Sequence, residues 1–118
     1  MVMREAKSGV ITDEIKLVAK KEGVDPDKVR RYVAEGKIVI VKNNLRQNIE
    51  PLGIGANLFT KVNANIGTSM FVNDLEMEKR KLRIAIEYGA DTVMDLSTGG
   101  DIDGIRRELI SLSTVPFG

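Results

Sequence analysis

Residues 58–69 read LFTKVNANIGTS, and this stretch decides the fold class of the chain. From Leu58 to Ile66 the side chains alternate between two faces, which is the two-residue period of a β-strand. Gly67 and the two hydroxyl residues after it predict that the strand ends there. We therefore expect a strand over residues 58–66, followed by a turn.

The residues after this strand predict a helix. Asn73 with Glu76 three residues later forms a capping-box pattern with asparagine as the cap, and Gly89 predicts the end of the helix. Apolar residues recur at helical spacing and are expected to face inward. These residues are Leu75, Leu82, Ala85 and Ile86.

A second strand and a second helix are expected next. Residues 91–96 predict the strand, and Asp101 predicts the cap of the helix. Residues 115–118 resemble the approach to a further strand. The inward-facing residues expected on this helix are Ile102, Ile105, Leu109 and Leu112.

The first half of the chain predicts two short helices and one strand. Thr12 is expected to cap a helix that stops at Gly23, and Asp25-Pro26 begins a second helix that ends at Gly36. Residues 37–41 are β-branched and predict a strand, whereas residues 42–55 predict a loop. The expected inner faces carry Ile15, Val18, Ala19, Val29, Tyr32 and Val33.

This order of elements predicts the α/β class with two domains, residues 1–57 and 58–118. The second domain reads strand–helix–strand–helix, which is two βα units with parallel strands. A closed (β/α)₈ barrel takes about 250 residues, so the chain supplies about a quarter of one. A two-stranded sheet needs other surfaces to cover it.

The composition excludes several kinds of chemistry. The chain has 118 residues with no cysteine and no histidine, so it offers no disulfide, no thiolate and no imidazole base. Its net charge of +1 does not suit a strongly basic nucleic-acid module. No apolar run approaches the ~20 residues of a membrane span, and the first residues lack a signal peptide pattern. We expect a cytoplasmic protein without membrane or nucleic-acid partners.

Two polar segments are candidates for binding. Lys61, Asn63 and Asn65 share one face of the first expected strand, and amide side chains can fix a polar ring or a ribose. The alternative is a solvated edge. The turn at residues 97–100 could bind an anion at a helix start, or it could be an ordinary connecting loop with Asp101 as the cap.

Three segments resemble one known family. They are residues 49–55 (IEPLGIG), 61–69 (KVNANIGTS) and 88–99 (YGADTVMDLSTG), and they occur in order at family spacing. They resemble the phosphomethylpyrimidine synthase family of thiamine biosynthesis, and the related hydroxybenzimidazole synthase branch shares them. The chain departs from the family by having no histidine at residues 43–46 and by Thr68, where many members have asparagine.

The resemblance implies a fold, a reaction and site residues. Members convert aminoimidazole ribotide to hydroxymethylpyrimidine phosphate by radical chemistry with S-adenosylmethionine, a [4Fe–4S] cluster and a zinc ion. They are homodimeric lyases with an N-terminal domain and a (β/α)₈ barrel, of which this chain would hold the N-terminal α+β segment and the first two βα units. By motif, Asn65 and Met94 resemble substrate-binding residues; no catalytic or metal-ligating residue is implied within this chain.

The cysteines and histidines of the family lie beyond the segment that matches this chain. We therefore expect that the chain binds neither the cluster nor zinc and is an N-terminal fragment that is inactive alone. Exposed apolar faces are expected to drive self-association. One alternative is a small stand-alone binding or regulatory protein for an imidazole ribotide. The other is a DNA-binding regulator built on the helix pair 13–22 and 26–35, with DNA binding carried by Arg30 and Arg31 and a local basic bias from Lys28, Arg30, Arg31, Lys37 and Lys42.

Overall fold

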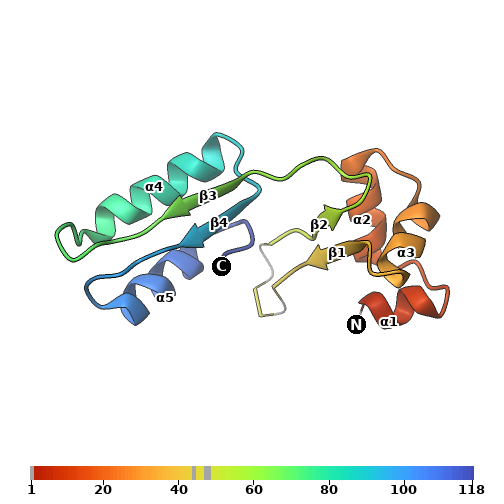
Figure 1. Ribbon diagram of the computed structural model, residues 1–118, viewed down its shortest axis with the longest axis horizontal. Helices are drawn as coiled ribbons and strands as arrows, with labels where there is room; N and C mark the ends of the chain where they lie inside the picture. The colour runs from red at the N-terminus through yellow and green to blue at the C-terminus, as the bar shows by residue number, and fades with distance from the viewer. Residues whose placement is uncertain (1, 44, 47–48) are drawn as a thin grey trace. The chain divides into compact units, whose positions relative to one another are not determined.

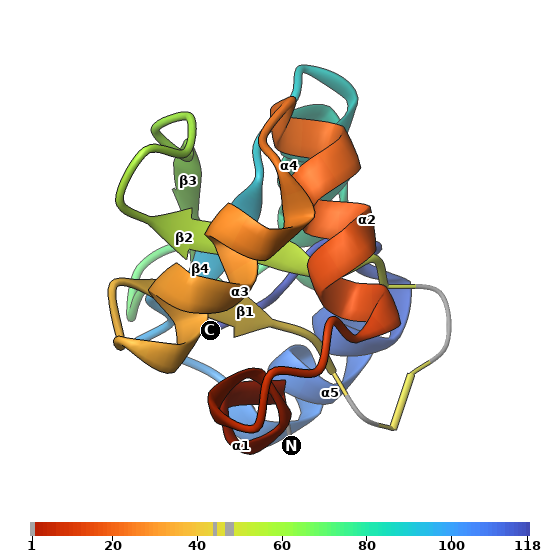
Figure 2. The same ribbon diagram turned by 90° about the vertical axis from the view of Figure 1, so that its right-hand side faces the viewer.

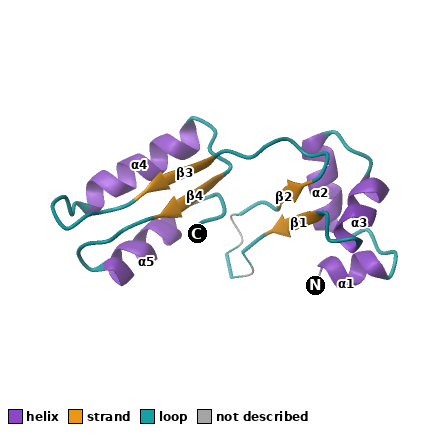
Figure 3. Ribbon diagram, viewed as in Figure 1, coloured by secondary structure: helices purple, strands orange, loops and turns teal. Residues whose placement is uncertain are grey.

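The computed structural model describes residues 2–43, 45–46 and 49–118 (Figure 1). The described residues form a mixed α/β chain in which three helices precede three strands, and a helix, a strand and a last helix follow (Figure 3). The contacts divide the chain into two compact units, residues 1–60 and 61–118, which we call unit 1 and unit 2. Among the described residues, each helix falls short of the length and apolarity that crossing a bilayer requires.

The described residues of unit 1 form three helices and a hairpin. Its elements are α1 (Val2–Lys7), α2 (Asp13–Glu22), α3 (Pro26–Ala34), β1 (Ile38–Val41) and β2 (Leu52–Gly55). The predicted caps of α2 and α3 are confirmed, because the Thr12 and Asp25 side chains accept hydrogen bonds from the backbone three residues on. Helix α1 was not expected from the residue pattern.

The core of unit 1 lies between the helices and β1. Figure 2 shows α2 and α3 beside β1, and α1 packs on α3. The inward faces predicted for α2 and α3 are confirmed, and β1 adds one buried residue. The buried set is Ala6, Ile15, Val18, Ala19, Val29, Val33 and Ile38.

Strand β2 corrects the loop predicted for residues 42–55. Residues 52–55 pair antiparallel with β1, with Val41 opposite Leu52 and Ile38 opposite Gly55. The glycines obscured this strand, yet one of them is required by packing. A Cβ atom on Gly53 would lie 2.5 Å from a methyl carbon of Val18. Residues 44, 47 and 48 of the predicted loop lie outside the described residues.

Unit 2 contains two βα units, as predicted. Its elements are β3 (Asn63–Ile66), α4 (Leu75–Glu87), β4 (Thr92–Asp95) and α5 (Ile102–Leu112), and β3 pairs with β4 in parallel. Helices α4 and α5 contact each other and pack on the same face of this pair, and Figure 1 shows α4 beside β3 and α5 beside β4. The core consists of Ile66, Leu82, Val93, Ile105 and Leu109.

The strand predicted over residues 58–66 is too long. Of residues 58–66, only 63–66 pair with β4. Leu58 packs instead on the core of unit 1, and the Phe59 N–H donates to the buried Glu22 carboxylate. The alternating pattern therefore continues across the boundary between the units, although the strand does not.

Two further details of unit 2 differ from the predictions. The cap of α4 is Asp74, whose carboxylate accepts from the Met77 N–H at 3.1 Å, and not Asn73. The Asn73 side chain lies instead where a Cβ atom on Gly100 would be. Leu112 was expected to face inward, yet it is exposed in the last turn of α5.

The expected approach to another strand is confirmed. Phe117 forms a parallel bridge with Val93, on the side of β4 away from β3. The Val93 N–H donates to Pro116 O at 3.1 Å, and the Gly118 N–H donates to Val93 O at 3.0 Å. Strand β4 therefore has parallel backbone partners on both sides.

Candidate functional site

Asn65 and Met94 are direct neighbours across the β3–β4 pair. They are register partners, so both side chains stand on the same face of the sheet. The next residues, Ile66 and Val93, are buried and face the helices. Asn65 is exposed, and Met94 retains 42% of its accessible surface. The structure thus brings the two predicted site residues together on the face that α4 and α5 leave uncovered.

A line of hydrogen bonds crosses this face. The Thr92 hydroxyl donates to Asn63 Oδ1 at 2.8 Å, and Asn63 Nδ2 donates to Asn65 Oδ1 at 2.8 Å. Thr92 is the register partner of Asn63. The line therefore follows one strand pair and then runs along β3, and it ends on the amide of Asn65.

Hydrogen bonds join the loops that follow β3 and β4. The Thr68 N–H donates to Ser97 Oγ at 3.0 Å, and the Thr68 hydroxyl donates to Gly99 O at 2.6 Å. The Ser97 hydroxyl and N–H both donate to the Asp95 carboxylate. These groups are buried, so each hydrogen bond satisfies a group that would otherwise be costly to bury. The loops are fixed relative to the strand ends.

Asp95 is the anchor of this network. Its carboxylate also accepts from Arg106 Nε at 2.8 Å, which joins β4 to α5. Burial of the carboxyl raises its pKa, but the hydrogen bonds from Ser97 and Arg106 outweigh burial and hold the pKa of Asp95 below its ordinary 3.8. Asp95 is therefore a charged structural group, and its pKa shift is opposite to that of a general acid.

A second buried carboxylate was missed by the sequence interpretation. Glu78 Oε2 accepts from the Gly67 N–H at 2.7 Å, and Glu78 Oε1 accepts from Lys81 Nζ at 2.6 Å. Glu78 lies three residues after Leu75 and four before Leu82, on the apolar stripe of α4. An acidic residue in the apolar phase of a helix was the signal that could have identified it.

Backbone N–H groups in and just after the turn that follows β4 donate hydrogen bonds within unit 2. The Ser97 N–H donates to Asp95, the Thr98 N–H donates to Thr68 O, and the Gly104 N–H donates to Asp101. Since these amides already have acceptors within unit 2, the geometry favours the connecting-loop interpretation over anion binding at this turn.

The basic residues of unit 1 also have internal partners. Arg30 Nε donates to Asp27 at 2.8 Å, and its guanidinium donates to Ala6 O at 3.0 Å. Arg31 pairs with the same Asp27 carboxylate at 3.4 Å. These contacts tie α3 to itself and to α1, which favours a structural role over DNA contact.

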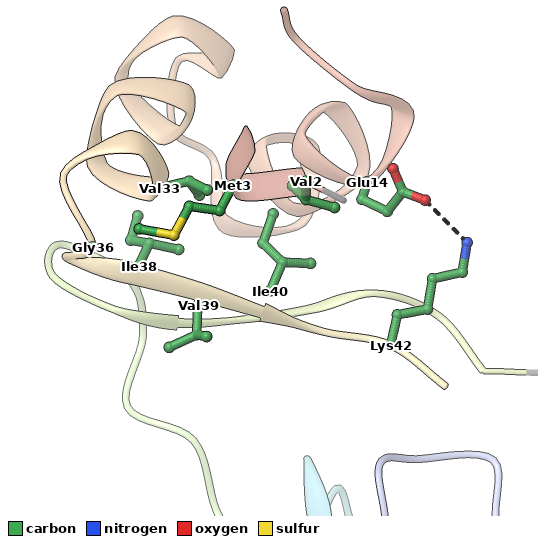
Figure 4. A pocket seen from close by; sticks show the side chains of 9 residues that line it. All are labelled: Val2, Met3, Glu14, Val33, Gly36, Ile38, Val39, Ile40 and Lys42. Carbon is green, nitrogen blue, oxygen red and sulfur yellow. Dashed lines mark hydrogen bonds and ion pairs between the residues drawn. The ribbon is translucent and has the colours of Figure 1, made fainter. Parts of the chain in front are cut away.

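Unit 1 has a groove of about 490 Å³ beside β1. Figure 4 shows Met3 and Val33 facing Ile38 across it, with Val39 on the opposite side of the strand. Glu14 and Lys42 lie at one end of this groove and form an ion pair of 3.2 Å. The hydrogen bond from its own backbone, and then Lys42, lower the pKa of Glu14 against the effect of burial.

The donor set does not suit the metal groups that the resemblance implies. The chain has no cysteine and no histidine, so it offers no thiolate to a [4Fe–4S] cluster and no imidazole to zinc. Within residues 2–43, 45–46 and 49–118, carboxylates do not gather in a group that could hold a metal ion.

Comparison with known proteins decides the family. Residues 1–118 match the radical SAM ThiC family. The chain belongs to this family. It is 58% identical over 116 residues to phosphomethylpyrimidine synthase 1 of Methanothermobacter thermautotrophicus, which is 98% of this chain and 27% of that protein. The similarity therefore extends over both units.

Other members of the ThiC family match to a similar degree. The phosphomethylpyrimidine synthase of Sulfolobus acidocaldarius is 52% identical over 99% of this chain and 27% of its own length. That of Thermodesulfovibrio yellowstonii is 53% identical over 96% of this chain and 26% of its own length. The chain thus spans about a quarter of the length of these curated relatives.

Proposed function

We propose that this chain forms part of a phosphomethylpyrimidine synthase, which converts aminoimidazole ribotide to hydroxymethylpyrimidine phosphate in thiamine biosynthesis. The observation that supports the proposal is 58% identity over 98% of the chain to a relative of that name. The reaction is radical S-adenosylmethionine chemistry of the lyase type, in keeping with the family.

In this proposal, the chain contributes binding residues and not the reacting groups. The uncovered face of β3–β4 presents an amide from Asn65 beside a thioether from Met94. An amide forms directed hydrogen bonds with ribose or ring atoms, and a thioether packs against a flat ring. Together they suit a ribotide, which has both kinds of surface.

In this proposal, β3 and β4 are the first two strands of a (β/α)₈ barrel. Parallel pairing, one helix after each strand and the bridge at Phe117 support this arrangement. In such a barrel the face that carries Asn65 and Met94 points inward, and their position toward the carboxyl ends of the strands is where barrel enzymes bind substrate. The cluster, S-adenosylmethionine and zinc would be held by residues outside this chain.

We also propose that copies of the parent protein associate as a homodimer. Exposed apolar side chains support association, and the loop before α4 carries Met70, Phe71 and Val72. Light scattering on the protein expressed from its complete gene tests this. A monomer at micromolar concentration would contradict it.

The experiment that tests the function is a turnover assay of the protein expressed from its complete gene. The protein is purified without oxygen, reconstituted with iron and sulfide, and supplied with S-adenosylmethionine and aminoimidazole ribotide. Formation of hydroxymethylpyrimidine phosphate supports the proposal. Formation of a hydroxybenzimidazole instead would place the protein in the related branch. Absence of both products would overturn the proposal.

A matched pair of methionines tests the site. Met94→Ala should weaken ribotide binding about 3- to 10-fold, the effect of losing one buried thioether contact. Met77→Ala removes the same side chain at nearly the same exposure, 41% against 42%, from helix α4. Equal effects of the two substitutions would overturn the assignment of Met94.

A further inference from the structure

The amide of Asn65 can face a ligand in two ways. It can present its NH₂ group as a donor or its oxygen as an acceptor, and the two choices select opposite ligand atoms. What surrounds the amide decides between them. The relevant neighbours are the two residues that precede Asn65 in the hydrogen-bonded line across the sheet.

In the structure the hydrogen bonds of this line all run in one direction, from Thr92 through Asn63 to Asn65. The Thr92 hydroxyl donates to Asn63 Oδ1, so the opposite atom of that amide, Nδ2, is the donor to Asn65. Asn65 Oδ1 is thereby occupied as an acceptor. Among the described residues, no hydrogen bond is made by Asn65 Nδ2, and its two hydrogens remain for a ligand.

Resting on the proposed function, we propose that Thr92 and Asn63 are positioning residues that orient the Asn65 amide to donate a hydrogen bond to an acceptor atom of the ribotide. Acceptor atoms of this kind are ribose oxygens, phosphate oxygens and the unprotonated ring nitrogen. Thr92 and Asn63 act through Asn65 and do not themselves touch the ligand.

The physical reason is preorganisation. A side-chain amide on an open sheet face rotates freely unless a neighbour fixes it, and ordering it on binding costs conformational entropy. The register pairing of Asn63 with Thr92 places the Thr92 hydroxyl of β4 within hydrogen-bond distance of the Asn63 amide. The amide of Asn65 is therefore oriented before the ligand arrives.

The substitution Asn63→Asp tests the direction of the line. Aspartate has nearly the shape of asparagine, but its ionised carboxylate only accepts hydrogen bonds. It can still accept from Thr92, yet it would draw Nδ2 of Asn65 toward itself and turn the amide oxygen to the ligand. We expect about tenfold weaker ribotide binding, measured by calorimetry on the protein expressed from its complete gene.

Two comparison variants separate orientation from other effects. Asn63→Ala frees the Asn65 amide without reversing it, and Thr92→Val removes the hydroxyl at constant shape, so each should cost about threefold. A purely structural role would make the near-isosteric Asn63→Asp the mildest of the three. Since Asn63 is exposed, thermal melting should confirm that every variant folds.

A double-mutant cycle with Asn65→Ala separates orientation from charge. If the aspartate acts through the amide, Asn63→Asp should cost less than about twofold once Asn65 is alanine. An equal loss in both backgrounds would mean that the new charge repels the ligand directly, and it would overturn the proposal. Unchanged affinity of Asn63→Asp in the wild-type background would overturn it as well.

Failure of the proposed function gives a different result. If the wild-type protein does not bind ribotide, or if Asn65→Ala leaves the affinity unchanged, the ligand or the role of Asn65 is wrong. If Asn65→Ala weakens binding while the three substitutions at Asn63 and Thr92 do not, the role of Asn65 stands and the orienting line is wrong.

Discussion

The carboxylate of Glu78 on α4 accepts a hydrogen bond of 2.7 Å from the backbone N–H of Gly67, the residue that follows β3. A buried acid thus holds the end of the strand that carries Asn65. The side chain of Glu78 is almost fully buried and also pairs with Lys81. Loss of Glu78 would leave the partly buried Gly67 N–H without its acceptor.

The first prediction concerns this contact. Glu78→Leu should lower the free energy of unfolding by about 2–3 kcal/mol, because it leaves the Gly67 N–H without an acceptor. Urea denaturation of the purified chain measures the change. Glu87→Leu, in the exposed last turn of the same helix, is the control and should change stability by less than about 0.5 kcal/mol. Equal effects would show that the hydrogen bond between Gly67 and Glu78 does not contribute to stability.

The second prediction concerns Gly67 itself. Its φ is +152°, and a Cβ atom there would lie 2.6 Å from the Ser97 nitrogen. Gly67→Ala should therefore destabilise the chain by more than about 3 kcal/mol through strain and backbone overlap together.

Gly89→Ala is the matched control for Gly67→Ala. Gly89 also has a positive φ, +90°, but nothing lies within 4 Å of a Cβ atom there. Only backbone strain should appear, about 1–2 kcal/mol. If denaturation gives the same loss for both variants, the close approach of the two loops at Gly67 is not significant.

The third prediction concerns acid stability. The pKa of Asp95 is lower in the folded chain than its ordinary 3.8, so the folded state favours the ionised form. Its contribution to stability is fully present above pH 3.8 and is lost as the pH falls through the lower, folded pKa. Asp95→Asn should cost about 1–3 kcal/mol at pH 7.

Denaturation over a pH series measures this difference. The gap between wild type and Asp95→Asn should narrow steadily below about pH 4. Asp103→Asn, which alters an exposed carboxylate in the first turn of α5, serves as the control. A gap that stays constant down to the lowest pH at which the chain folds would contradict the role of the Asp95 charge.

The fourth prediction concerns the core of unit 2. Leu82 is 1% exposed between α4 and the strands, and Leu82→Ala should cost about 2–5 kcal/mol by leaving a cavity. Ile84→Ala, on the exposed side of the same helix, should cost less than about 1 kcal/mol. Comparable losses would indicate that α4 does not pack on the sheet as described.

Most of the elements could be predicted because their signals are local. Thr12, Asp25 and Asp101 cap helices through contacts three residues away, and the apolar residues of α2 and α4 recur at helical spacing. Strand β2 could not be predicted, because its identity depends on a pairing with β1 across an intervening loop and on the space beside Val18 at Gly53.

The candidate site shows the same division. Asn65 and Met94 could be selected from their motifs, and their placement near strand ends was expected from the βα pattern. The line from Thr92 through Asn63 could not, because it depends on the register between β3 and β4. The ion pair of Asp95 with Arg106 likewise joins residues of different elements.

Consecutive residues of β4 lie on opposite faces of the sheet. Met94 lies on the face that the helices leave uncovered, and the Asp95 carboxylate lies on the helix side, where it pairs with Arg106. A slip of one position would move the carboxylate to the open face and the thioether into the helix interface. Gain or loss of a single residue between Gly89 and Leu96 would therefore remove Met94 from the uncovered face and break the pairing of Asp95 with Arg106 at the same time. Evolution can vary side chains in this segment one at a time, but its length should be held constant.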